Sequence, residues 1–253
     1  MLLDEPVTVP RLAVAKAWEW EQVGPAHPVL GVVDVWVEGE AAERLDELAR
    51  QALAEPGFYH LRTGRVTGRL RDLLLAIANA DTECYGWSTD RRGHERAMLA
   101  VPVGRNAVLA TVENDLLTLA TIKANHLVHA IVDSLPDFPA ADIHEFAIPK
   151  ADYEPRTTGS YTLDTTSDYT AAEQLRTLMT SPRAASHQLY VAARADSTRQ
   201  SSVPLTAVDT NDHGRVLTYL STTPTGDHDI TCGPGTPAYL AATLQNTLAA
   251  LRE

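Results

Sequence analysis

Apolar positions in the first part of the chain recur at helical spacing. Leu12 to Val23 and Glu40 to Ala54 each gather apolar side chains on one side, and each segment ends before a glycine or proline. Val7–Val9 and Pro28–Val37 are rich in valine, which favours extended structure. We therefore expect a mainly helical N-terminal region with short extended pieces, up to residue 63.

The pattern becomes more regular from Thr67 onward. Short polar turns separate segments in which apolar and polar residues alternate, as they do in half-buried strands. The predicted elements are a helix over residues 67–79, strands Thr82–Thr89, Arg96–Val103, Ala107–Val112 and Leu116–Ile122, and a helix over residues 124–135. Because the connections are short, neighbouring strands should pair antiparallel.

The same order of elements returns after residues 149–169, which show no sustained period and are predicted to form a linker. The segment Thr170-Ala171-Ala172-Glu173 has the form of a capping box, so we expect a helix to begin at Thr170. A hydroxyl cap and a proline at Thr236-Pro237 predict the start of the last helix. The strands predicted between these helices are Ser186–Ala195, Ser201–Thr210, Arg215–Ser221 and His228–Cys232.

This repetition predicts the fold class. Two α-β4-α units, each with a half-apolar sheet and amphipathic helices, can bury their apolar faces together. We expect an α+β protein with a central antiparallel sheet and two quasi-two-fold related halves, residues 1–148 and 170–253, packed as one globular domain.

Charge and composition exclude several classes of function. The net charge of −12 disfavours nucleic acid and anionic lipid, which bind through lysine and arginine. No stretch reaches the roughly 18 uninterrupted apolar residues of a membrane span. The segment Met1–Pro6 lacks the features of a signal peptide, and two cysteines suit a reducing compartment. We expect a soluble, cytoplasmic protein without membrane insertion.

Motifs for catalysis and for cofactor or metal binding are missing. The chain has no phosphate-binding glycine loop and no GxSxG. His126, His129 and Asp133 fall near one face of a predicted helix, but no HExxH or paired cysteines accompany them. Asp209–Gly214 begins like a calcium loop, yet Leu220 stands where a bidentate glutamate is needed. We expect no catalytic residues, no metal and no cofactor.

Several strings and their order resemble the EspG family, the type VII (ESX) secretion-associated proteins of actinobacteria. The resemblance covers nearly the whole chain. It rests on Val7-Thr8-Val9 before the Trp18 helix, Met98-Leu99-Ala100 through Asn106-Ala107-Val108-Leu109, Gln188-Leu189-Tyr190-Val191, Asp209-Thr210 through His213-Gly214-Arg215-Val216-Leu217, and Gly235-Thr236-Pro237.

The resemblance implies a central antiparallel sheet flanked by two helical bundles. It also implies a cytosolic chaperone that binds a helical secretion substrate of the PE/PPE kind and keeps it soluble for export. The family binds its substrate through the sheet, a loop between early strands and the C-terminal helical bundle. The segment matched to that loop is the short connection Thr89–His94, so the expected partner-binding residues are Trp87, Arg91, Arg92 and His94.

Two other classes of function stay open. A self-associating adaptor module would form a stable homodimer without a helical client. An enzyme or small-ligand-binding protein would show a deep pocket with convergent polar groups.

Overall fold

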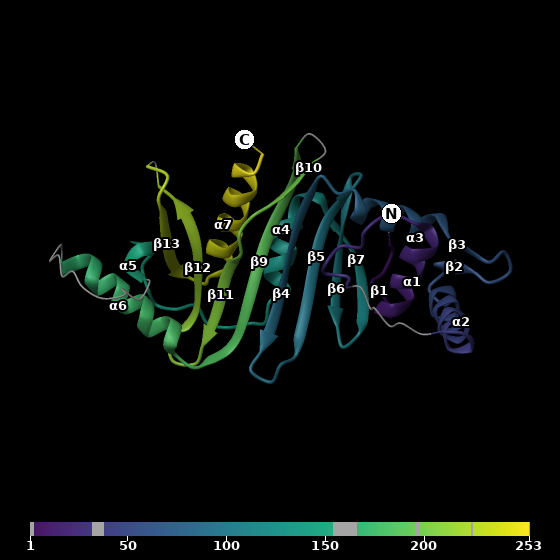
Figure 1. Ribbon diagram of the computed structural model, residues 1–253, viewed down its shortest axis with the longest axis horizontal. Helices are drawn as coiled ribbons and strands as arrows, with labels where there is room; N and C mark the ends of the chain where they lie inside the picture. The colour runs from purple at the N-terminus through teal and green to yellow at the C-terminus, as the bar shows by residue number, and fades with distance from the viewer. Residues whose placement is uncertain (1–2, 32–37, 154–165, 196–197, 224, 253) are drawn as a thin grey trace.

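The computed structural model describes residues 3–31, 38–153, 166–195, 198–223 and 225–252 (Figure 1). Its α-helices are α1 (Arg11–Glu21), α2 (Glu40–Ala54), α3 (Gly68–Ala78), α4 (Leu127–Asp133), α5 (Lys150–Tyr153), α6 (Thr166–Thr180) and α7 (Pro237–Ala250). A short 3-10 turn, η1 (Ala124–His126), precedes α4.

The strands follow the alternating segments of the sequence closely. They are β1 (Val7–Pro10), β2 (Tyr59–His60), β3 (Arg65–Val66), β4 (Thr82–Asp90), β5 (Glu95–Val103), β6 (Asn106–Glu113), β7 (Leu116–Lys123), β8 (Phe146–Pro149), β9 (Arg183–Ala195), β10 (Thr198–Ser201), β11 (Leu205–Thr210), β12 (Gly214–Thr222) and β13 (His228–Pro234).

Eleven strands form one antiparallel sheet in the order β1-β7-β6-β5-β4-β9-β11-β12-β13-β8, with β10 added beside β9. Strands β2 and β3 form a separate two-stranded hairpin. The α+β class and the large antiparallel sheet are therefore confirmed. Within the described residues, no helix is both long and apolar enough to span a membrane.

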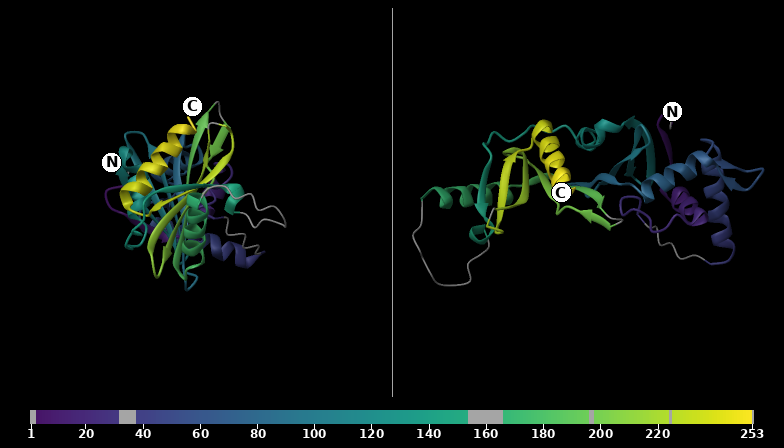
Figure 2. Two further views of the ribbon diagram at one scale, coloured as in Figure 1. Left: turned by 90° about the vertical axis from the view of Figure 1, so that its left-hand side faces the viewer. Right: turned by 90° about the horizontal axis from the view of Figure 1, so that it is seen from above.

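Helices cover the two faces of the sheet differently. We call the face under α4 and α7 the outer face. Its core includes Met98 and Leu189 beneath Ile131 and Leu244. On the other face, which we call the inner face, α1 to α3 cover one end and α6 covers the other, so the middle has no helix over it (Figure 2).

Side-chain alternation explains why the inner face is apolar at both ends. Along β4, Tyr85 and Trp87 point to the inner face, whereas Cys84 joins the outer core. Under α3, Leu99 is completely buried, and under α6, Cys232 is completely buried.

Burial raises the pKa of the Cys84 thiol to about 12, which makes it a poor nucleophile.

The two halves are joined at the centre of the sheet, where β4 pairs antiparallel with β9 from Thr82↔Ala193 to Asp90↔Ala185. On each side of this pair, three further strands follow in chain order, and a short strand, β1 or β8, closes the edge. This order is what a two-fold axis through the β4–β9 pair would produce. The equivalence of the halves and their boundaries stay predictions.

Several predicted elements differ from the structure. The predicted linker contains α5, and α6 begins at Thr166, so Thr170 lies inside the helix instead of capping it. A local S/T-x-x-E pattern cannot show that one more helical turn precedes it. Residues 154–165 of the linker lie outside the described residues.

The predicted strand Ser201–Thr210 is two strands, β10 and β11, because Pro204 lacks the N–H that a continuous ladder needs. The helix predicted over residues 124–135 begins as the η1 turn. The extended segment predicted from Pro28 begins with a turn closed by the Leu30 N–H on the His27 carbonyl, and residues 32–37 lie outside the described ones.

Candidate functional site

The uncovered middle of the inner face is an uncharged strip that crosses five strands. Cα pairing from β5 to β12 aligns one residue of each strand in a single row, and we call this row the inner strip: Ala97, Trp87, Gln188, Thr206 and Thr218. Each of these residues is half-buried or exposed. At the two ends the row continues into Val112 and Cys232, which are buried.

Three aromatic rings form a cluster at the centre of this face. Tyr85 and Tyr190 occupy paired positions of β4 and β9, and their rings stack with centroids 5.1 Å apart and planes 7° apart. Trp87 meets Tyr85 and Tyr190 edge-on, at 5.6 Å from each. Such offset and edge-on pairs are favourable and hold the rings in fixed orientations. The cluster therefore presents a rigid, half-buried apolar surface.

Gly86 allows the two central strands to approach closely behind this cluster. A Cβ atom at this position would lie 2.6 Å from the Gln188 carbonyl oxygen and 2.9 Å from a Leu189 methyl group. A side chain at residue 86 would separate the strands that carry Tyr85 and Tyr190.

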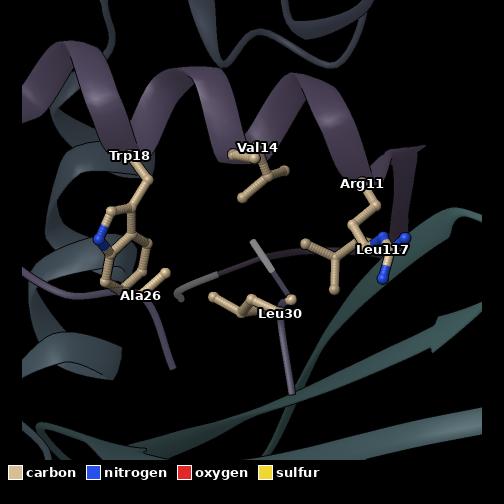
Figure 3. Close-up of a pocket in the computed structure, with 8 residues that line it drawn as sticks. Arg11, Val14, Trp18, Ala26, Leu30 and Leu117 are labelled. Atoms are coloured by element: carbon tan, nitrogen blue, oxygen red, sulfur yellow. The ribbon is translucent and has the colours of Figure 1, made fainter. Parts of the chain in front are cut away.

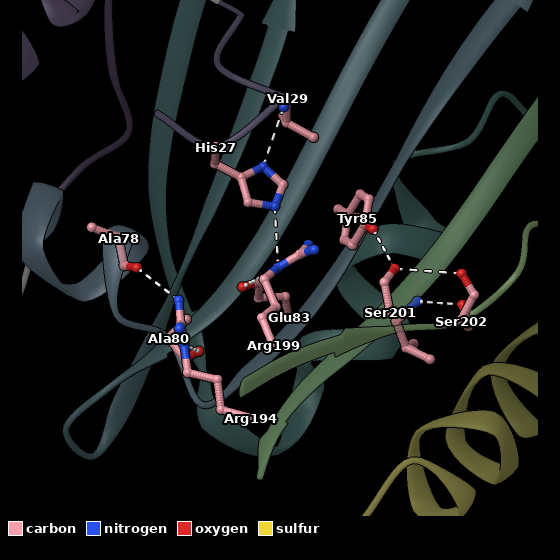
Figure 4. A network of polar contacts seen from close by, with 11 residues as sticks. His27, Val29, Ala78, Ala80, Glu83, Tyr85, Arg194, Arg199, Ser201 and Ser202 are labelled. Atoms are coloured by element: carbon pink, nitrogen blue, oxygen red, sulfur yellow. Dashed lines mark hydrogen bonds and ion pairs between the residues drawn. The ribbon is translucent and has the colours of Figure 1, made fainter. Parts of the chain in front are cut away.

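A buried carboxylate fixes one end of the cluster (Figure 4). Glu83 accepts hydrogen bonds from Arg199 at 2.6 and 3.0 Å, and His27 Nε2 lies 3.1 Å from Glu83 Oε2. Arg199 also lies over the Tyr85 ring, at 5.4 Å from its centroid. We call Glu83, His27 and Arg199 the inner network.

The pKa of Glu83 shows which effect dominates in this network. Burial alone would raise the pKa of Glu83, but the hydrogen bonds from His27 and Arg199 outweigh it and lower the pKa below its usual value. The carboxylate therefore stays ionised and ties β10 to β4.

The predicted partner-binding residues fall in two places. Trp87 belongs to the aromatic cluster, whereas Arg91, Arg92 and His94 are exposed in the turn between β4 and β5. The Arg91 N–H donates to the Ala184 carbonyl at 2.9 Å, which holds the turn against the start of β9. The four residues share one hairpin, but the Trp87 ring packs on the tyrosines and not on the turn.

Asp90 gives this turn a fixed shape. Its Oδ1 accepts from the Arg92 and His94 N–H groups at 2.7 and 3.0 Å, and its Oδ2 lies 3.1 Å from His94 Nδ1. The backbone hydrogen bond from His94 is the main reason that the pKa of Asp90 is lowered. The turn is thus short and ordered before any partner binds.

A second polar cluster lies beneath the outer face. His187 contacts Ser88 Oγ at 2.8 Å and Asp209 Oδ2 at 3.1 Å, and Arg215 donates to both carboxylate oxygens of Asp209. We call His187, Asp209 and Arg215 the outer network. A serine, a histidine and an aspartate are in contact here, as in hydrolases. However, His187 is completely buried and Ser88 is 6% exposed, so substrate has no access.

Three cavities in the described part of the chain lie away from the inner strip. The cavity between α1, Leu30 and Leu117 measures about 10 Å³, room for about one water (Figure 3). Two larger open hollows, of about 660 and 580 Å³, lie beside α4 and beside the β12–β13 turn. Within the described ranges, no three His, Cys, Asp or Glu side chains are grouped to hold a metal ion.

Sequence reasoning missed Tyr85, Tyr190 and the inner network as parts of the site. The alternation of β4 does place Tyr85 and Trp87 on one face. The contact with Tyr190 depends on pairing between strands about a hundred residues apart, for which a single sequence carries no signal.

Comparison with known proteins identifies the family. The model of the EspG family matches residues 10–246. The chain belongs to the EspG family. Comparison with curated proteins gives no match. A similar solved structure is that of the Mycobacterium tuberculosis type VII secretion system chaperone EspG5 in complex with a PE25–PPE41 dimer. It has a TM-score of 0.68 and 13% identity, with 96% of this chain and 95% of that chain covered.

Proposed function

We propose that this EspG-family protein is a type VII secretion chaperone that acts in the cytoplasm. It binds a helical client of the PE/PPE kind and keeps the client soluble until export. The inner strip is the observation that carries the proposal. It is an uncharged, aromatic surface at the centre of the sheet that no helix of the described chain covers.

The chemistry of the strip suits an apolar helix tip. A client with an exposed apolar tip would self-associate, and a sheet face with a polar rim can cover that tip. Trp87 and Tyr190 supply aromatic anchors, and Gln188, Thr206 and Thr218 supply uncharged polar contacts. Arg91, Arg92 and His94 form part of the rim. An interface of this type would bury about 1,200–2,000 Å² in total.

The EspG5 structure supports this kind of partner, because that relative is in complex with a PE–PPE dimer. Supporting evidence for a binding role over an enzymatic one comes from the outer network, whose serine and histidine are sealed from solvent. Edge-to-edge self-association is less favoured, because β1 and β8 are four-residue edge strands that both end in proline.

The test uses the protein as bait in the lysate of its own host, followed by reconstitution of the captured client. We expect to capture a small helical protein or pair of the PE/PPE type. Light scattering should show that it forms a complex of defined mass with the chaperone, and the client alone should precipitate.

Gln188→Lys places a charge in the strip at an exposed position. It should weaken client binding about tenfold or more, which corresponds to about 1.4 kcal/mol.

Trp87→Ala should weaken binding by a similar or larger factor, because anchor residues at interface centres commonly contribute about 2 kcal/mol or more. Leu48→Ala is the matched control, since Leu48 is 55% exposed on α2, away from the strip. Circular dichroism would establish that each variant is folded. A client that binds all three variants as tightly as the wild type would exclude the inner strip as its site.

A further inference from the structure

The β2–β3 hairpin is a basic projection on an acidic protein. Residues 56–71 contain four arginines and no aspartate or glutamate, although the whole chain has 33 acidic and 21 basic residues. Two of these arginines are neutralised, since Arg69 pairs with Asp4 at 3.7 Å and Arg71 pairs with Glu21 at 3.0 Å. The other two, Arg62 and Arg65, flank the tip of the hairpin.

The tip carries charge and apolar surface without internal partners. Arg62 and Arg65 are exposed, and no described residue forms an ion pair or a hydrogen bond with either side chain. Leu61 beside them is 59% exposed, the highest value among the exposed large apolar residues of the described chain. An exposed leucine next to an exposed arginine adds little to the stability of the fold, because most of its side chain stays in water.

The hairpin is nevertheless well anchored. Phe58 is completely buried and Tyr59 is 8% exposed, and the Thr67 N–H donates to the Phe58 carbonyl at 2.9 Å. At the tip, the His60 carbonyl accepts from Thr63 and Gly64 at 3.1 and 2.9 Å, and Gly64 adopts the positive φ of +67° that this turn needs. A surface fixed in this way loses little entropy when a partner binds.

The position of the hairpin separates it from the inner strip. Figure 1 shows β2 and β3 at the end of the molecule beyond α2 and α3, whereas the strip crosses β4, β9 and β11 in the middle. A partner at the hairpin would therefore leave the strip free for a client.

We propose that the β2–β3 hairpin is a second docking element that binds an acidic surface of another protein, with an apolar pocket for Leu61. Charge complementarity is the argument for acidity, and arginine is enriched among the residues that contribute most to binding at protein interfaces. A lipid surface fits less well. Each arginine gains only about 1 kcal/mol there, and anionic lipid repels a chain with a net charge of −12.

The experiment measures binding of a fluorescein-labelled peptide of glutamate and leucine by anisotropy, with a glutamine-for-glutamate peptide as control. The test variant is Arg62→Glu with Arg65→Glu. The charge-matched control is Arg44→Glu with Arg105→Glu, which alters exposed arginines on α2 and on the β5–β6 turn. All four positions are exposed, so we expect the variants to fold, and circular dichroism checks that they do.

We expect the acidic peptide to bind the wild type, with an affinity that falls as salt is added. The hairpin variant should lose affinity about tenfold or more, and the control variant should lose about threefold or less. Leu61→Ser should weaken binding without changing its salt dependence. The strip variant Gln188→Lys should bind the peptide normally, so a failed client-binding proposal and a failed hairpin proposal give different results.

Three results would overturn the proposal. The first is equal loss in the hairpin and control variants, which would make the attraction unspecific. The second is tighter binding to phosphatidylglycerol vesicles than to the peptide, abolished by the hairpin substitutions, which would assign the hairpin to lipid. The third is a dimer at low salt that the hairpin substitutions dissolve, which would make the partner a second copy of this chain.

Discussion

The inner and outer networks join the same three kinds of side chain in different surroundings. In each, a histidine Nε2 lies 3.1 Å from a carboxylate that also accepts hydrogen bonds from Nε and Nη2 of one arginine. Both carboxylates are buried, with Glu83 2% and Asp209 1% exposed. The arginines differ, because the Arg199 side chain is 31% exposed and the Arg215 side chain only 4%.

Because of this difference, the Arg199 side chain can become hydrated when its ion pair is lost, whereas the Arg215 side chain cannot. If Glu83 is lost, Arg199 can turn toward water, because it lies on the exposed strand β10. If Asp209 is lost, Arg215 keeps its charge in a place that water does not reach. An unpaired buried charge costs far more than an exposed one. The outer network is therefore structural, and the inner network can adjust beside the candidate site.

The surroundings of Arg215 explain why it cannot move. Its guanidinium donates to the Pro136 carbonyl at 2.8 Å, and its backbone N–H donates to the Pro139 carbonyl at 2.7 Å. A Cβ atom at Gly235 would overlap the Arg215 side chain. Arg215 thus holds the segment between α4 and β8 against β12.

Removal of the outer carboxylate should give the largest effect on stability. We expect Asp209→Ala to lower the free energy of unfolding by about 3–5 kcal/mol, because Arg215 loses its counter-charge inside the protein. Urea denaturation followed by circular dichroism measures this loss. Asp212→Ala is the control, since Asp212 is exposed in the neighbouring turn, and it should change stability by less than about 0.5 kcal/mol. Equal losses in the two variants would contradict the structural role.

Removal of the inner carboxylate should cost less and act locally. We expect Glu83→Ala to lower the free energy of unfolding by about 1–3 kcal/mol, because Arg199 regains water while His27 loses a buried partner. Hydrogen exchange should rise in β10 and in the paired end of β9, where Ser201 lies opposite Ala192. Exchange in β12 should stay unchanged. A loss as large as that of Asp209→Ala would show that Arg199 is not free to rehydrate.

The sequence predicts individual strands well and their partners poorly. Alternation identifies β4 and places Tyr85 beside Trp87, and the cap at Thr236 is confirmed by the hydrogen bond that its hydroxyl accepts from the Tyr239 N–H at 3.1 Å. These features depend on residues within a few positions of one another. The Tyr85–Tyr190 stack depends on the β4–β9 junction, and the inner network joins His27, Glu83 and Arg199 from distant parts of the chain. Pairing over such separations leaves no local pattern.

One difference between the predicted and observed strands has a visible signal in the sequence. Pro204 marks the break between β10 and β11, since proline cannot donate to a sheet ladder. The short edge strand β8 had no such signal, because its four residues end in Pro149 and gain their structure from pairing with β13. The assignment of Arg91, Arg92 and His94 as partner contacts stays a prediction.

Acidification should reduce the difference in the free energy of unfolding between the wild type and Glu83→Gln. We expect this effect to be smaller than those of the two alanine substitutions. Folding lowers the pKa of Glu83 below its ordinary value of 4.5, so its contribution is complete above that pH. As the pH falls further, the unfolded chain takes up the proton first. The stabilisation from Glu83 then decreases and is lost once the pH passes through the folded-state pKa.

Urea denaturation of both proteins from about pH 5 to about pH 3 measures the gap, and carboxylates common to both proteins cancel in the difference. Asp209→Asn should follow the same direction, because hydrogen bonds from Arg215 and His187 outweigh burial and lower the pKa of Asp209. A stability difference that increased on acidification would mean that burial raises the carboxyl pKa by more than those hydrogen bonds lower it. The carboxyl group would then be neutral in the folded protein, and its arginine would lack the ion pair on which the comparison of the two networks depends.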